Sequence, residues 1–249
     1  MKREIKSGTS ILRRTASEVK RYRILLRITP IILGITTLVL VLTYVITILY
    51  DRYGSFSVSV NKFSNVRYAL TLSETADFST QVSRLNSKAS VDITNIDGTT
   101  LPNDLDSDTG GDKSGQNFLA YTFYCKNAGQ EAVIYEYNLV IKNATQDIGR
   151  AVRVRLYVDG KEETYAAART ADGLPEDGTT VFYRDNSMVA YGQIAGFQPG
   201  DITKYTVVVW LEGNDADCTD DIIGGEFKVD MELNILGGEE LETMDFEAA

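Results

Sequence analysis

An uncharged apolar run from Ile28 to Tyr50 constrains this chain more than any other feature of its sequence. As a helix, at about 1.5 Å per residue, the run reaches roughly 34 Å and can cross a hydrocarbon layer of about 30 Å. Pro30 and Gly34 near its start are common in membrane helices, and Tyr50 and Tyr53 lie near its far end, where aromatic rings favour the interface. The sequence therefore predicts one transmembrane helix over residues 28–50.

The charge around this run predicts its orientation. Residues 1–27 carry nine Lys or Arg and two Glu, a net charge of +7, so the formal charge of −10 for the whole chain leaves −17 for the residues that follow. Positive flanks stay in the cytoplasm. A cleaved signal peptide is the alternative, but the run is longer than the usual apolar region of about 7–15 residues, and "ILYDRYG" offers no small-residue cleavage site.

These observations predict a single-pass protein of the cell membrane, with a cytoplasmic N-terminus and an extracellular C-terminal domain. The expected division is a basic cytoplasmic tail at 1–27, the transmembrane helix at 28–50, an extracellular domain at 51–236 and an acidic C-terminal tail at 237–249. The lipid bilayer is thus one expected partner. The acidic outer part argues against nucleic-acid binding, which needs basic surfaces.

After Gly54 the hydrophobic pattern changes to a period of two. "SFSVSV" alternates serine with Phe56, Val58 and Val60, and "AVRVRLYV" at 151–158 alternates aliphatic with polar or aromatic residues. Such alternation is typical of strands with one buried and one solvated face. About ten strand-like runs follow, with turn residues between them. The sequence predicts an all-β fold, an antiparallel β-sandwich resembling a jelly roll, preceded by one transmembrane α-helix; two smaller sandwiches are the alternative.

The absence of histidine from the chain limits its chemistry. It excludes Ser-His-Asp and Cys-His nucleophile systems and H-E-x-x-H zinc sites. A hydrolase with a pair of carboxylates is not excluded, but an abundance of Asp and Glu does not show which of them meet in space. We therefore expect that the protein is not an enzyme.

The two cysteines are Cys125, at the end of the strand-like run "FLAYTFYC", and Cys218, in the loop after "YTVVVWLE". In an oxidising compartment, two cysteines favour a disulfide. The predicted bridge joins one strand end to the loop after another strand; two separate thiols are the alternative.

Two acidic loops are candidate sites. Asp104, Asp106 and Asp108 alternate as at the start of a calcium loop, but glycine comes one position late and no closing Glu follows, so a solvated acidic loop is the favoured reading and a calcium site is the alternative. Calcium is the one cofactor to consider. In "VVVWLEGNDADCTDD" at 207–221, we predict a corner held by the second cysteine, with partner binding through Trp210, Glu212 and Asp215 as the second reading and metal binding as the third.

Three segments resemble a known family: "FYCKNAGQEAVIYEYNLVI", "GFQPGDITKYTVVVWLEGND" and "YGSFSVSV". They are similar to the TasA/camelysin-like surface proteins of Gram-positive bacteria, with Asn127-Ala-Gly129 and Pro199-Gly200-Asp201 as the two turns. The resemblance implies an anchored or secreted jelly-roll sandwich and a role in matrix, fibre or surface assembly. The family usually has a cleavable signal, which this chain is not expected to have, and no motif here carries the protease activity attributed to part of the family.

Together these features predict a membrane-anchored bacterial surface protein with a structural, adhesive or fibre-assembly role. A strand of another copy, or of another surface protein, would add to an exposed edge formed by Phe56, Val58 and Val60. The alternative is a ligand-binding or sensory ectodomain that uses the acidic loops and calcium.

Overall fold

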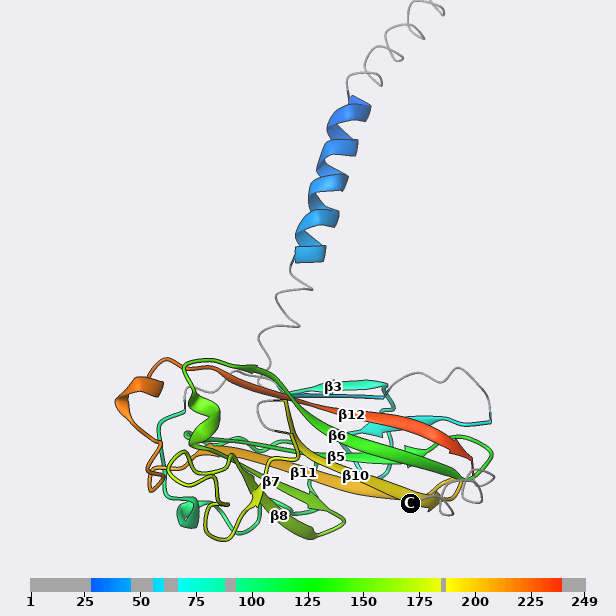
Figure 1. The fold of residues 1–249 in the computed structure, drawn as a ribbon. Coiled ribbons are helices and arrows are strands. Elements are labelled where there is room, and N and C mark those ends of the chain that lie inside the picture. Colours follow the sequence, from blue (N-terminus) through cyan, green and yellow to red (C-terminus); the bar gives the residue numbers. More distant parts are fainter. Residues whose placement is uncertain (1–27, 46–55, 61–66, 88–92, 185–186, 239–249) are drawn as a thin grey trace, which may run out of the picture. The chain divides into compact units, whose positions relative to one another are not determined.

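A computed structural model describes residues 28–45, 56–60, 67–87, 93–184 and 187–238 of the chain (Figure 1). The chain divides into two compact units, Met1–Tyr53 and Gly54–Ala249. The predicted cytoplasmic tail and most of the predicted C-terminal tail lie outside the described residues. The last strand reaches Gly238, so the second unit continues past the predicted boundary at residue 236.

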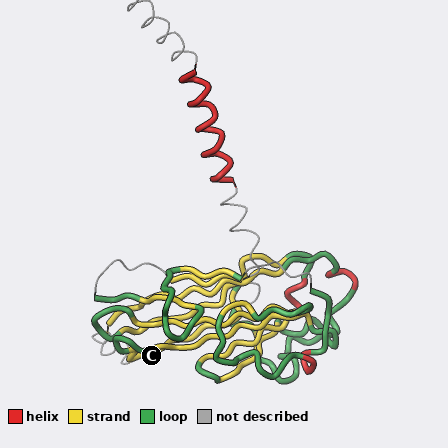
Figure 2. The backbone as a smooth tube through the Cα atoms, turned by 180° about the vertical axis from the view of Figure 1, so that it is seen from behind, coloured by secondary structure: helices red, strands yellow, loops and turns green. Residues whose placement is uncertain are grey.

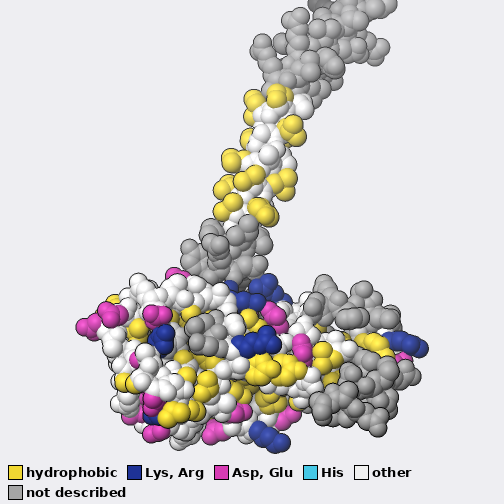
Figure 3. All heavy atoms as spheres, viewed as in Figure 1, with side chains coloured by type: hydrophobic (Ala, Val, Ile, Leu, Met, Phe, Trp, Pro, Cys, Tyr) yellow, Lys and Arg dark blue, Asp and Glu magenta, His cyan; other side chains and the backbone are white. Residues whose placement is uncertain are grey.

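The described part of the first unit is one helix, Ile28–Val45, which is long and apolar enough to cross a membrane. Its hydrophobic side chains are exposed along its whole length (Figure 3). The hydroxyls of Thr36, Thr37 and Thr43 donate hydrogen bonds to main-chain carbonyls four residues earlier, so the helix satisfies them internally. The predicted apolar helix is confirmed over these residues, and residues 46–50 lie outside the described part.

The second unit consists of two sheets. The first has the strand order β10-β6-β12-β1-β3. Its strands are β1 (Phe56–Val60), β3 (Arg84–Asn86), β6 (Val133–Ala144), β10 (Met188–Phe197) and β12 (Phe227–Gly238). The second has the order β2-β5-β11-β7-β8-β9, with β4 beside β5. Its strands are β2 (Leu70–Ser73), β4 (Gly111–Asp112), β5 (Phe118–Asn127), β7 (Val152–Val158), β8 (Lys161–Ala166), β9 (Thr180–Val181) and β11 (Ile202–Leu211).

Both sheets are mixed, which corrects the prediction of a purely antiparallel fold. The first strand, β1, pairs in parallel with the last strand, β12, and β8 pairs in parallel with β9. The other strand pairs are antiparallel. Helical structure within the described part of this unit is limited to three single turns in loops (Figure 2), η1 (Gly98–Thr100), η2 (Ile148–Arg150) and η3 (Asp220–Ile222).

The inward-facing side chains of both sheets form one hydrophobic core. The predicted core face of β7 is confirmed, because Val152, Val154 and Leu156 are buried in this core, but the opposite face is not fully solvated, since Arg153 is 5% exposed. Aromatic residues fill its centre: the rings of Phe123 and Tyr205 stack with centroids 5.2 Å apart. The hydroxyl of Tyr205 lies 2.8 Å from that of Tyr135, on the opposite sheet, so each buried phenol has a hydrogen-bond partner.

A second hydrophobic cluster covers the other face of the second sheet. Leu101 and Leu105 pack there against Trp210, Val208 and Ala120. The segment 103–116 is therefore partly a cover for this sheet, and its Gly111–Asp112 pairs with β5. This cover could not be predicted from the sequence, because the two leucines stand singly among polar and turn residues.

Strand β1 is not a sheet edge, which corrects a prediction. It lies between β12 and β3, and it pairs with both. Phe56 and Val58 are fully buried and Val60 is 8% exposed. The alternation of serine with apolar residues indicates one buried face, but it does not reveal whether a strand has one neighbour or two.

Candidate functional site

The segment around Trp210 packs into the protein, so it does not present this side chain to a partner. Trp210 is 2% exposed, and its indole N–H donates to Glu212 Oε2 at 3.0 Å. The same carboxylate oxygen accepts the main-chain N–H of Gly98 at 3.1 Å. The guanidinium of Arg155 lies over the indole ring, 5.2 Å from its centroid. Glu212 therefore ties η1 to the end of β11, and the predicted partner-binding role of Trp210 has no exposed surface to support it.

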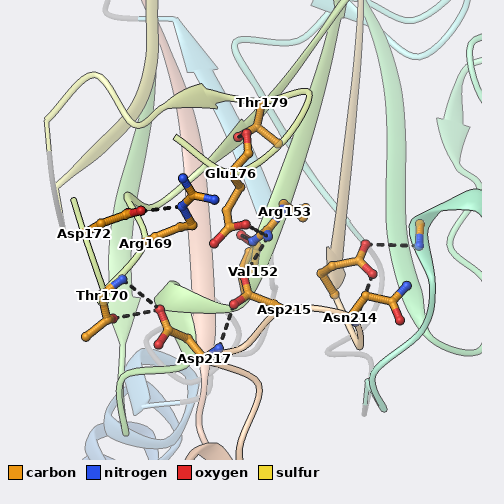
Figure 4. A network of polar contacts seen from close by, with 12 residues as sticks. Val152, Arg153, Arg169, Thr170, Asp172, Glu176, Thr179, Asn214, Asp215 and Asp217 are labelled. Atoms are coloured by element: carbon orange, nitrogen blue, oxygen red, sulfur yellow. Dashed lines mark hydrogen bonds and ion pairs between the residues drawn. The ribbon is translucent and has the colours of Figure 1, made fainter. Parts of the chain in front are cut away.

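Asp215 belongs to a buried ion-pair network on the same side of the second sheet (Figure 4). Its Oδ2 lies 2.6 Å from Nη2 of Arg153, on β7, and both side chains are almost completely buried. The carboxylate of Glu176 approaches the same nitrogen at 3.7 Å. Asp215 Oδ2 makes no aligned hydrogen bond, so the 2.6 Å contact is an ion pair alone.

Removal of Glu176 from water raises the pKa of its carboxyl group, and the charge of Asp215 raises it further, against the opposing effect of Arg153. Nearby, Asp217 Oδ2 accepts hydrogen bonds from the main-chain N–H and the hydroxyl of Thr170 (Figure 4). The network thus joins the loop 167–179 to the loop after β11. This geometry indicates a structural role in joining the two loops, because the Arg153 guanidinium, which could otherwise bind an anion, already faces the carboxylates of Asp215 and Glu176.

The acidic loop at 104–108 contacts the ammonium groups of two lysines elsewhere in the chain, Lys113 and Lys204. Lys204 Nζ donates to the main-chain carbonyl of Asp106 at 2.7 Å and forms ion pairs with Asp106 and Asp108. Lys113 Nζ donates to the carbonyls of Leu105 and Ser107. The described residues contain no group of three or more His, Cys, Asp or Glu side chains that could hold a metal ion. The alternative of a calcium site at Asp104, Asp106 and Asp108 therefore finds no support in the described residues, because the ammonium group of Lys204 contacts the carboxylates of Asp106 and Asp108.

The two ammonium groups differ in their environment. Burial lowers the pKa of Lys113, and the charge of Asp106 offsets this only in part. Burial also acts to lower the pKa of Lys204, but the hydrogen bond and charge of Asp106 outweigh it and leave that pKa raised. Lys204 is therefore the main counter-charge of this loop.

Cys125 and Cys218 are free thiols, so the predicted disulfide is wrong. Strands β5 and β11 are antiparallel, and Cys125 lies opposite Thr203, near the start of β11. Cys218 follows the end of β11, after a strand that spans roughly 30 Å at about 3.3 Å per residue. The prediction treated both cysteines as lying at strand ends, but these are opposite ends of the sheet.

The two turn motifs that carry the family resemblance lie against each other. Asn127 Nδ2 donates to the carbonyls of Phe197 at 2.7 Å and Glu131 at 2.9 Å, and its Oδ1 accepts the N–H of Gly129. Its main chain bonds the second turn as well: the Gly200 N–H donates to Asn127 O, and the Asn127 N–H donates to Asp201 O. Asn127 is 1% exposed. This corner fixes the start of β6 and β11 relative to β5.

Among the described residues, the longest sheet edge without a neighbouring strand is β10, at the end of the first sheet. The other end strands, β2, β3 and β9, have four, three and two residues. The part of β8 that extends beyond β9 begins with exposed Lys161, Glu162 and Glu163, which are charges of the kind that prevent strand addition. Strand β10 has ten residues, "MVAYGQIAGF", and none is charged.

Two glycines interrupt the pattern of β10, so its full length could not be predicted from the sequence. Gly192 is required by a close approach: a Cβ there would lie 2.2 Å from the hydroxyl oxygen of Tyr137, whose ring lies under the strand. Gly196 has a φ of +63°, in the left-handed region that favours glycine.

Comparison with known proteins assigns the chain to no family. No protein-family model matches it, and no curated protein does so. Among solved structures, a β-glucosidase from Kluyveromyces marxianus is similar over 66% of this chain and 15% of its own, at 10% identity and a TM-score of 0.23. An α-xylosidase from Xanthomonas citri is similar over 72% of this chain and 19% of its own, at 9% identity and a TM-score of 0.25. Both TM-scores are too low to indicate a shared fold.

Proposed function

We propose that the protein is a single-pass, membrane-anchored bacterial surface protein whose extracellular β-sandwich has a structural, adhesive or fibre-assembly role. The observation that carries this proposal is the separation of the chain into an exposed apolar helix and a two-sheet unit with its own core. The positive net charge before the helix supports a cytoplasmic N-terminus. Acidic side chains scattered over the visible face of the sheet unit suit a soluble domain facing the medium (Figure 3).

The sheet unit supports a structural role better than a catalytic one. Its ionised clusters, around Arg153 and around Lys204, are internally paired and join loops to the sheet. The corner at Asn127 likewise uses its polar groups to fix strands. We also propose that the protein is related to the TasA/camelysin-like proteins. The contact between the two turn motifs supports this, since the residues that resemble the family form one structural element.

Cysteine accessibility tests the topology on which this function depends. In a Cys218→Ser background, Lys161→Cys places a thiol on the exposed start of β8, and Ser7→Cys places one before the helix. A membrane-impermeant maleimide added to intact cells should label the first variant, and label the second only after permeabilisation. The opposite pattern, or protection of both thiols, contradicts a surface-exposed domain. Electron microscopy of cells with and without the protein then tests whether it forms a surface layer or fibre.

A further inference from the structure

The free side of β10 has a defined set of unpaired main-chain groups. The Ile141 N–H donates to the carbonyl of Ser187 at 3.0 Å, so the odd-numbered residues of β6 direct their main-chain groups toward β10. Their partners on β10 are the even-numbered residues Ala190, Gly192 and Ile194. Tyr191 and Gln193 therefore direct their N–H and C=O groups away from the sheet.

Both ends of this free stretch are fixed by the structure. At its start, the Tyr183 N–H donates to the carbonyl of Val189 and covers the edge. At its end, the register shifts between Ile194 and Phe197, a bulge of the kind that interrupts regular pairing. The stretch available to an added strand is thus residues 191–195, in which Gln193 and Ala195 are exposed.

Charge favours a second copy of the chain as the added strand. The chain has a net charge of −10, so two copies repel over most surfaces. Residues 188–197 carry no charge, so two β10 strands can approach without placing like charges opposite each other. An antiparallel pair of identical strands also satisfies two-fold symmetry, which is the commonest symmetry of soluble homo-oligomers.

We propose that two copies of this chain pair through their β10 strands, antiparallel and about a two-fold axis near Gln193, so that their first sheets join into one. This inference rests on the proposed surface-assembly role and names the partner. Gln193 then lies opposite its counterpart in the second copy, and Tyr191 lies opposite Ala195. The outward N–H and C=O groups of these residues exchange hydrogen bonds across the axis.

Disulfide trapping of the full chain in cell membranes tests this pairing. Residues directly opposite each other in an antiparallel pair have Cβ atoms about 4.5–5.5 Å apart, close to the reach of a disulfide. In a Cys218→Ser background, Gln193→Cys should give a species of twice the monomer mass after mild oxidation. Glu162→Cys, equally exposed on the charged edge of β8, is the matched control. Equal yields from the two variants, no product, or a product of another mass would overturn the proposal.

A proline variant provides a second test. The Gln193 N–H faces away from β6, so Gln193→Pro removes a main-chain hydrogen bond of the proposed pair and no main-chain hydrogen bond to β6. Both Gln193→Pro and Gln193→Thr lose the hydrogen bond that the Gln193 side-chain amide donates to the Tyr191 hydroxyl, so this loss is matched between them. Gln193→Thr keeps that N–H and suits a strand. Light scattering of the detergent-solubilised full chain should find dimers for the wild type and Gln193→Thr, and monomers for Gln193→Pro. Dimers of Gln193→Pro refute pairing through β10, and should this variant not fold, the trapping experiment still decides.

Failure of the pairing and failure of the proposed function give different results. A membrane-impermeant maleimide that labels Gln193→Cys on intact cells, without dimer formation, refutes the pairing and leaves the surface location intact. A thiol that is labelled only after permeabilisation refutes the surface location itself.

Discussion

Replacement of Asn127 by aspartate should destabilise the sheet unit severely, although the two side chains have the same shape. The asparagine amide donates to two carbonyls, those of Glu131 and Phe197, and the residue is 1% exposed. Aspartate keeps the acceptor for the Gly129 N–H but loses both donors. Each buried acceptor left without a donor costs about 1–3 kcal/mol, so the expected loss is roughly 2–6 kcal/mol of unfolding free energy. Domains of this kind have about 5–15 kcal/mol in total.

The pH dependence of this variant has a defined sign. A carboxylate held against two carbonyl oxygens has its pKa raised in the folded state above the unfolded value of about 3.9. The destabilisation is therefore fully present above the folded-state pKa and becomes smaller as the pH falls through it, because the protonated acid donates one hydrogen bond. The gap in stability between wild type and variant should be larger at pH 7 than at acidic pH.

Fluorescence of Trp210 provides the assay, since it is the only tryptophan in the chain and lies buried in the sheet unit. Denaturant unfolding of the full chain in detergent gives the midpoint and slope for each variant. Asn103→Asp, the same change at an exposed site, is the control and should stay within about 0.5 kcal/mol of wild type. A loss below about 1 kcal/mol at pH 7 for Asn127→Asp would show that the corner does not depend on its amide donors.

Three further changes test the buried charges and thiols. Asp215→Asn leaves the Arg153 guanidinium, 6% exposed, without its closest counter-ion, and should cost about 3–5 kcal/mol, read from the denaturation midpoint. Glu176→Gln should raise the melting temperature at pH 7, because burial and Asp215 raise the pKa of this carboxyl; the advantage should shrink as the pH falls toward the unfolded value of 4.5, and a constant advantage would contradict this cause. A thiol reagent should modify half-buried Cys218 in the native protein and Cys125 only after unfolding, because burial raises the pKa of the latter and shields it; equal rates would contradict the described core.

The apolar helix and the predominance of strands could be predicted from the sequence because both depend on local periodicity. The buried face of β7 followed from its alternation in the same way. The pairing of the strands could not be predicted from local periodicity, because the serine-rich alternation of β1 fits an edge strand and an interior strand equally well. Its burial depends on β12, which is far away in the sequence.

The candidate sites failed for a related reason, because they assumed neighbours that the topology does not supply. Cys125 and Cys218 each stand near the end of a strand, but antiparallel pairing places those ends apart. The sequence of the acidic loop at Asp106 resembles a calcium site, but in the structure its positive counter-charge is Lys204, which lies on a strand distant in the sequence. Only the corner at Asn127 was visible as a pair of turns, and even there the sequence did not show that the turns meet.

The parallel pairing of β1 with β12 has a consequence for the order in which the protein can fold. Strand β1 is synthesised before the other strands, but its place between β3 and β12 exists only once the last strand has been made. A chain threaded from its N-terminus must therefore hold Phe56 and Val58 exposed through nearly all of its synthesis. Closing so long a loop is slow, because the chain loses conformational entropy before the strand pairing contributes any stabilising contacts. We expect truncation within β12 to leave a chain that cannot complete its first sheet, and that depends on chaperones or is degraded.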